Sequence, residues 1–294
     1  MPAISCNHCK KLISDQEESC PFCASPQYKP TPTVSIPAKS TLLPSSTPVT
    51  SWLVAVNILL FVACLVVDLN NGRTVGNILV SLGHPSTPTL QLFGMTGNFS
   101  WTCGYWWTLI TASFLHGGLL HIYFNMSALM QLGEITRVLL GPSRVIITYI
   151  ATGIGGFALS NVWSNAPTIG ASCSIFGLMG VLLVFGHRRG GELGKTLRQS
   201  VLRWTIIGLA MGFLIPMINN AGHIGGLLTG LLLGAIFPAR ESTGESSGLQ
   251  IFAMVLLCVS IVLVGWNALF LSKLIGQTQQ MGVMVCENYD ILFR

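Results

Sequence analysis

Runs of apolar residues, each close to one membrane thickness long, dominate the chain after its first fifty positions. An α-helix needs about 20 mostly apolar residues to cross a bilayer, and polar or glycine-rich connections separate the runs here. The fourth run is short for a full crossing, and a long connection at residues 70–106 separates the first run from the second. We therefore expect seven helices, at residues 51–69, 115–140, 143–162, 172–186, 201–218, 222–237 and 249–274.

Composition agrees with a membrane protein. Only 9% of the 294 residues are charged, whereas about 25% is usual for soluble domains. The net charge of +5 comes from basic residues scattered between apolar runs, so no basic face for nucleic acid is expected. The pattern predicts an all-α polytopic membrane protein whose main surroundings are the lipid bilayer.

The first thirty residues carry two C-x-x-C pairs, Cys6 with Cys9 and Cys20 with Cys23. Four thiolates at this spacing are typical of one tetrahedral zinc ion, although the spacing is shorter than in most paired knuckles. Free thiols or a redox dithiol are the alternatives. We predict a structural zinc in a small ribbon that the metal holds together, in a reducing, cytoplasmic compartment. A cytoplasmic protein partner for this head stays open.

The chain divides by composition into a head at 1–30, a Pro/Ser/Thr-rich linker at 31–50, a six-helix core at 51–240, an extra helix at 241–274 and a tail at 275–294. With the N-terminus in the cytoplasm, twelve of the fifteen Lys and Arg residues fall on the cytoplasmic side. That asymmetry follows the positive-inside rule. The short loops and the compact head favour a bacterial cytoplasmic membrane.

This topology brings polar side chains to one depth on the outer side. Ser172 begins the fourth helix and His223 the sixth, while His116, His121 and Asn125 lie at the outer end of the second. Polar and ionisable groups inside a membrane are costly and suggest function. No acidic residue falls at these helix ends, so a hydrolytic site here would be a Ser–His dyad, with His121 and Asn125 as oxyanion donors. Ser174 is the rival nucleophile, but it faces about 200° away from Ser172 around the helix.

The residues resemble the rhomboid intramembrane serine proteases over about 51–240, in the six-plus-one helix form. The resemblance implies that Ser172 is the nucleophile, His223 the base, and His121 with Asn125 the oxyanion hole. The resemblance further implies that Gly170, Phe176 and His116 support the site. The same resemblance implies that the substrates are transmembrane proteins and that catalysis needs no cofactor. The matching stretches are Gly170-Ala171-Ser172-Cys173, Ala221-Gly222-His223-Ile224-Gly225-Gly226, His116…His121…Asn125 and Trp106-Trp107-Thr108-Leu109-Ile110-Thr111.

Two positions depart from the family pattern. Cys173 stands where the G-x-S-G motif has its second glycine, and Arg137 stands about where an acidic residue often ends the second helix. Cys173 keeps open a rival function, a catalytically inactive relative that binds membrane helices. The second rival is a transporter with a His/Asn polar site. Cys103 and Cys286 both fall on the outer side, and the sequence leaves their pairing open.

Overall fold

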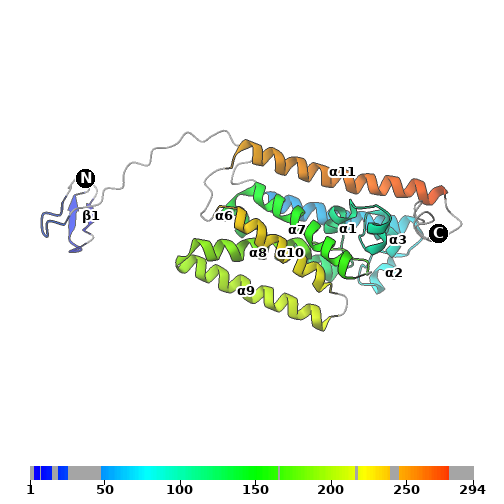
Figure 1. Ribbon diagram of the computed structural model, residues 1–294, viewed down its shortest axis with the longest axis horizontal. Coiled ribbons are helices and arrows are strands. Elements are labelled where there is room, and N and C mark those ends of the chain that lie inside the picture. Colours follow the sequence, from blue (N-terminus) through cyan, green and yellow to red (C-terminus); the bar gives the residue numbers. More distant parts are fainter. Residues whose placement is uncertain are drawn as a thin grey trace. The chain divides into compact units, whose positions relative to one another are not determined.

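The computed structural model describes residues 3–6, 8–14, 19–25, 48–164, 166–215, 218–238 and 245–277. The chain divides into two compact units, residues 1–40 and 41–294, and each is described by itself (Figure 1). Most of the predicted linker at 31–50 and most of the tail at 275–294, including Cys286, lie outside the described residues. The predicted domain boundaries therefore remain predictions.

The N-terminal unit is a short hairpin carrying two similar turns. Strand β1 (Ala3–Ser5) pairs antiparallel with β2 (Leu12–Ser14). Each C-x-x-C pair closes a tight turn, because Lys10 N–H donates to the Cys6 carbonyl at 3.0 Å and Ala24 N–H to the Cys20 carbonyl at 2.8 Å. Lys10 and Ala24 both adopt positive φ, at 62° and 56°. The repeated geometry brings both cysteine pairs to one place.

The second unit confirms the predicted all-α membrane fold with seven long helices (Figure 1). Of the described helices, α1, α7 and α11 are long and apolar enough to cross a membrane, and α10 is a shorter apolar helix. The seven are α1 (Val49–Asn70), α6 (Leu119–Leu140), α7 (Pro142–Trp163), α8 (Ser172–Arg189), α9 (Gly191–Leu214), α10 (Asn220–Ile236) and α11 (Ser247–Gln277).

Two predicted helix starts were wrong. Helix α6 begins at Leu119 and not at 115, because Gly118 takes φ 144° and breaks the helical path. His116 therefore lies in the segment before the helix. Helix α9 begins at Gly191, ten residues before the expected 201, because its first turns carry Glu192, Lys195 and Arg198 and so lack the apolar signal.

Glycines let α8 and α10 touch backbone to backbone. An added Cβ would overlap the Cys173 carbonyl oxygen at Gly226 and the Gly177 carbonyl oxygen at Gly230. Small residues four apart are the usual means of close helix approach in membranes. In α7, 67% of the span is buried, against 28% in α1 and in α11. Helices α7, α8 and α10 therefore form the centre, with α9 and α11 on opposite sides (Figure 1).

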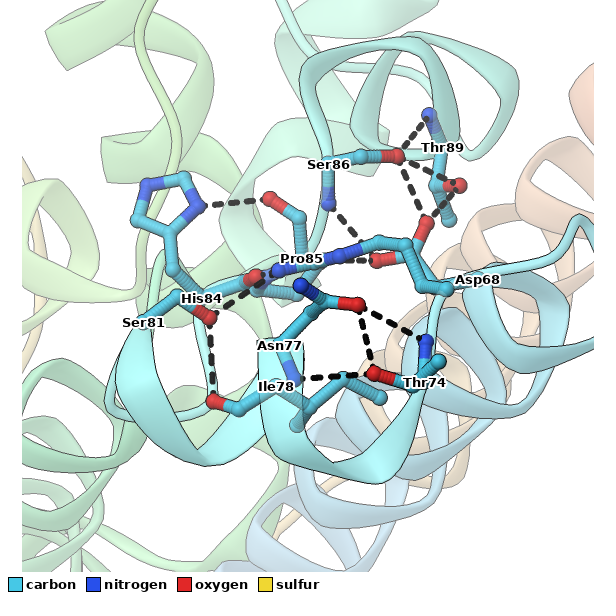
Figure 2. A network of polar contacts seen from close by, with 10 residues as sticks. Asp68, Thr74, Asn77, Ile78, Ser81, His84, Pro85, Ser86 and Thr89 are labelled. Carbon is cyan, nitrogen blue, oxygen red and sulfur yellow. Dashed lines mark hydrogen bonds and ion pairs between the residues drawn. The ribbon is translucent and has the colours of Figure 1, made fainter.

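The connection between α1 and α6, residues 71–118, is called the first loop. It contains five short helical segments, and its start is anchored on Asp68 near the end of α1. The buried Asp68 carboxylate accepts hydrogen bonds from Ser86 N–H at 2.8 Å and Thr89 Oγ1 at 2.5 Å, and pairs with Arg73 at 2.5 Å. Figure 2 shows this network. The segments are α2 (Val75–Val80), α3 (Thr87–Leu92), α4 (Asn98–Thr102), α5 (Thr108–Thr111) and the 3-10 helix η1 (Ala112–Phe114).

The carboxylate of Glu245, from the segment before α11, lies at the start of α7. Glu245 is 8% exposed, accepts a hydrogen bond from Ser143 N–H at 3.1 Å and lies 3.4 Å from Arg144 Nη1. An acidic group is favourable at a helix N-terminus because it meets unpaired N–H groups and the positive end of the helix dipole. Arg137, late in α6, pairs instead with Glu134 on its own helix.

Candidate active site

The segment before Ser172 is held in one conformation by the first loop. Gly170 takes φ +124°, a conformation that favours glycine. Its N–H donates to the Ala112 carbonyl at 2.9 Å, and two residues earlier Thr168 pairs with Thr96 through N–H···O contacts of 2.8 and 3.3 Å. Helix α8 then begins at Ser172. The serine is half-buried at the start of a helix whose next turns are buried.

His223, in the first turn of α10, lies against α8. Its ring stacks on Phe176 with centroids 4.2 Å apart and planes at 15°. Phe176 follows Ser172 by four residues, so the two side chains lie within about 40° of each other around the helix. The stack therefore places His223 one turn from Ser172 on the same face. Within the described residues, no hydrogen bond to Ser172 Oγ occurs, and His223 Nδ1 is buried without a partner.

His121 lies beside Gly170, two residues before Ser172. A Cβ added to Gly170 would lie 2.7 Å from His121 Nε2. Gly117 N–H donates to His121 Nδ1 at 3.1 Å, so in the neutral ring the proton is assigned to Nε2. His121 thus presents an N–H donor beside the start of α8. Asn125 uses one N–H on the His121 carbonyl at 2.8 Å, and its second N–H makes no hydrogen bond within the part of the chain that the structure describes.

His116 is buried deeper than His121. It is 1% exposed, its ring centroid lies 5.1 Å from that of His121 in an edge-on arrangement, and both of its ring nitrogens are buried without a hydrogen-bond partner among the described residues. His116 thus packs edge-on against His121 in the interior.

Cys173 points away from the Ser172 face. It is 2% exposed, and its side chain fills a slot between two helices: an added Cβ would lie 2.9 Å from its Sγ at Gly156 of α7 and also at Gly222 of α10. The cysteine side chain therefore packs into the helix interface. Ser174 is also turned away, because its fully buried hydroxyl donates to the Tyr149 carbonyl at 2.6 Å.

One positioning residue escaped the sequence reasoning. Asn219 caps α10, because its Oδ1 accepts from Gly222 N–H at 3.0 Å. Its Nδ2 donates to Ser160 Oγ at 2.5 Å and to Thr168 Oγ1 at 2.9 Å. The start of the His223 helix is thus tied to α7 and to the segment before Ser172. An asparagine just before an apolar helix is a known N-cap signal.

The four head cysteines form a separate cluster that can bind a metal. All four sulfur atoms lie within 4.8 Å of one another, with Cys6–Cys23 at 3.8 Å and Cys9–Cys20 at 3.6 Å. Zinc–sulfur bonds of about 2.3 Å in a tetrahedron place sulfurs about 3.8 Å apart, so the cluster fits zinc. The backbone N–H of Cys9, together with the Ser25 hydroxyl, lowers the pKa of Cys6 to about 5, which favours the thiolate form that binds metal.

Comparison with known proteins agrees with these features. The Rhomboid domain model matches residues 103–240. Rhomboid protease GluP of Bacillus subtilis (strain 168) is 37% identical over 52% of this chain, which covers 30% of that protein. YdcA of the same organism is 32% identical over 47% of this chain and 70% of its own length. Inactive RHOMBOID-like protein 8 of Arabidopsis thaliana is 29% identical over 61% of this chain and 57% of its own length.

The relatives thus include a protein named as a protease and one named as inactive, and the chain spans less than a third of GluP. The Rhomboid domain match includes Ser172, His223 and the His121–Asn125 pair. These helices, their glycine contacts and the matched residues lead to one conclusion: the chain is an integral membrane protein that belongs to the rhomboid family.

Proposed function

We propose that this protein is an intramembrane serine endopeptidase that cleaves transmembrane segments with a Ser172–His223 dyad. The observation that carries the proposal is the Phe176–His223 stack at 4.2 Å, one helical turn from Ser172. Acyl transfer needs a base and an oxyanion donor near the serine. The stack on Phe176 supports His223 in the first role, and the closeness of His121 Nε2 to Gly170 supports His121 in the second.

In the proposed reaction, Ser172 Oγ attacks the scissile carbonyl carbon while its proton passes to His223. The carbonyl oxygen gains the negative charge and accepts hydrogen bonds from His121 Nε2–H and the free N–H of Asn125. His223 then gives its proton to the leaving amine as the C–N bond breaks. Water hydrolyses the acyl-enzyme by the same route in reverse order. In this proposal the hydrogen bond between Ser172 Oγ and His223 forms when substrate binds. Catalytic hydrogen bonds are often long in substrate-free enzymes and shorten only in the complex.

The substrate chemistry follows from the location of the site. A peptide bond within a membrane helix is already hydrogen-bonded, so the segment has to unwind before Ser172 can reach it. Small or helix-breaking residues near the scissile bond lower the cost of that unwinding. We therefore propose transmembrane segments with such residues as the preferred substrates.

A fluorophosphonate probe tests whether Ser172 is activated. We expect the folded wild-type protein to react, and peptide mass spectrometry to place the adduct on Ser172. Ser174→Ala should label like the wild type, because the Ser174 hydroxyl is committed to the Tyr149 carbonyl. An adduct on Ser174, or none on a folded protein, would contradict the proposal.

The inactive, helix-binding relative remains the second candidate. The observation that favours it is the lack of a hydrogen bond to Ser172 Oγ within the described residues. Cys173 no longer favours it, because that side chain occupies the slot between Gly156 and Gly222 and leaves the Ser172 face open. A protein that binds membrane segments without reacting with the probe would support this second candidate.

We also propose that the N-terminus lies in the cytoplasm and that the site opens to the outer side of a bacterial inner membrane. Twelve of fifteen basic side chains then fall inside. Cys103, in the first loop, is disulfide-bonded. A disulfide on the outer side and a thiolate cluster on the inner side suit the two redox environments.

For the head, we propose a structural zinc bound by Cys6, Cys9, Cys20 and Cys23. The purified protein is expected to contain one zinc per chain, measured by plasma mass spectrometry. Cys6→Ser with Cys9→Ser should remove the metal, since two thiolate ligands are lost. Cys258→Ser, at an exposed position of α11, should keep it. A wild-type protein purified without zinc would make this proposal wrong.

A further inference from the structure

Helix α11 contributes one buried amide to the region around the first loop. Asn267 is 1% exposed and lies in a mostly apolar stretch of α11. A polar side chain in a membrane helix is costly unless its hydrogen-bonding groups are paired. All the polar atoms of Asn267 are paired, and every partner belongs to the first loop.

The Asn267 carbonyl oxygen accepts from Trp107 Nε1–H at 2.7 Å. Its Nδ2 donates to the carbonyls of Leu92 at 2.8 Å and Gln91 at 3.2 Å. Gln91 and Leu92 end α3; the Gln91 carbonyl also accepts from Gly94 N–H at 3.0 Å, whereas for the Leu92 carbonyl Asn267 supplies the donor that a helix end lacks. Asn267 thus caps α3 and at the same time holds Trp107, which precedes α5.

A short series of hydrogen bonds in the first loop connects α3 and Trp107 to the segment before Ser172. In α5, Thr111 Oγ1 donates to the Gly94 carbonyl at 2.7 Å, and the next residue, Ala112, accepts from Gly170 N–H at 2.9 Å. From α3 the chain runs two residues past Gly94 to Thr96, which pairs with Thr168. Two connected routes therefore lead from Asn267 to residues 168–170.

We propose that Asn267 is a positioning residue: by holding α3 and Trp107 it fixes the first loop in the place from which Ala112 and Thr96 set the conformation of the segment that presents Ser172. The inference rests on the proposed function for its consequence in catalysis. It makes the seventh helix a working part of the site, although α11 carries none of the residues assigned to the reaction.

The test compares Asn267→Leu with Ser260→Ala. Ser260 is also buried on α11, but its hydroxyl donates only to Leu256 of its own helix at 2.7 Å, so its loss should leave the loop unchanged. In Asn267→Leu, hydrogen–deuterium exchange should rise across residues 87–112 and 168–172. The fluorophosphonate labelling rate per folded protein should fall by about tenfold to a hundredfold, the scale expected for a misplaced catalytic group.

The two readouts separate the failure of this inference from the failure of the proposed function. If the wild type does not react with the probe, the proposed function is wrong, and the exchange measurement alone decides the role of Asn267. Unchanged exchange at 168–172, or an unchanged labelling rate beside a lower melting temperature, would overturn the inference. If Asn267→Leu does not fold, Trp107→Phe removes the Nε1–H that Asn267 accepts, together with part of the ring, and should shift both readouts in the same direction.

Discussion

Cleavage of a transmembrane substrate is expected to vanish in Ser172→Ala and to fall by about 10²–10⁴-fold in His223→Ala, the range that a general base supplies. The serine variant has no nucleophile, so no acyl-enzyme can form. The histidine variant keeps the hydroxyl and the donors of His121 and Asn125, but nothing accepts the proton as the C–O bond forms. Purified variants in lipid vesicles with a co-reconstituted substrate give the two rates.

His187→Ala is the matched control for that experiment. His187 is exposed in the last turn of α8, at the opposite end of the helix from Ser172, so its loss should leave the cleavage rate unchanged. Cleavage by His223→Ala at a rate close to that of the wild type would mean that another group takes the proton. Melting temperatures of all three variants show whether a lost rate is instead a lost fold.

The second large effect is expected on stability. Gly230→Ala should destabilise the protein by about 1–3 kcal/mol or more, the cost typical of overpacking a tight interior. The new methyl group would overlap the Gly177 carbonyl oxygen, and backbone atoms of α8 can yield only if the two helices separate. Thermal unfolding in detergent should show a clearly lower midpoint, with labelling of Ser172 lost in parallel.

Gly265→Ala adds the same methyl group at a position with open space around it. No atom lies within 4 Å of the position that a Cβ would take at Gly265 of α11. Alanine also favours a helix over glycine by up to about 1 kcal/mol, so this variant should melt at or above the wild-type temperature. Equal melting temperatures for the Gly230 and Gly265 variants would contradict close packing of α8 on α10.

Local sequence patterns were enough to predict the number and type of the helices and the family. Ser172 and Phe176 could be placed on one face because helical periodicity is local. The stack of Phe176 on His223 depends on α8 meeting α10, and the close glycine spacing of Gly226 and Gly230 indicated that approach in advance. The start of α9 was not predicted, because polar side chains can occupy the first turns of a helix that ends in the membrane.

The polar partners around the site could not be predicted, because each joins distant parts of the chain. Asn219 had a readable cap signal, yet its bonds to Ser160 and Thr168 depend on how three elements meet. Asn267 and Glu245 had no local signal at all. Their partners lie more than a hundred residues away along the chain, and only the assembled fold brings them together.

Glu245 affects how much of the chain the membrane core needs to be complete. The match to the Rhomboid domain begins after α1 and ends at residue 240, before the seventh helix. The carboxylate that caps α7 lies five residues beyond that limit, in the position where it meets Ser143 and Arg144. A gene shortened to the matched region would therefore leave the central helix with an uncapped end. The segment that leads into the seventh helix therefore also stabilises the start of the central one.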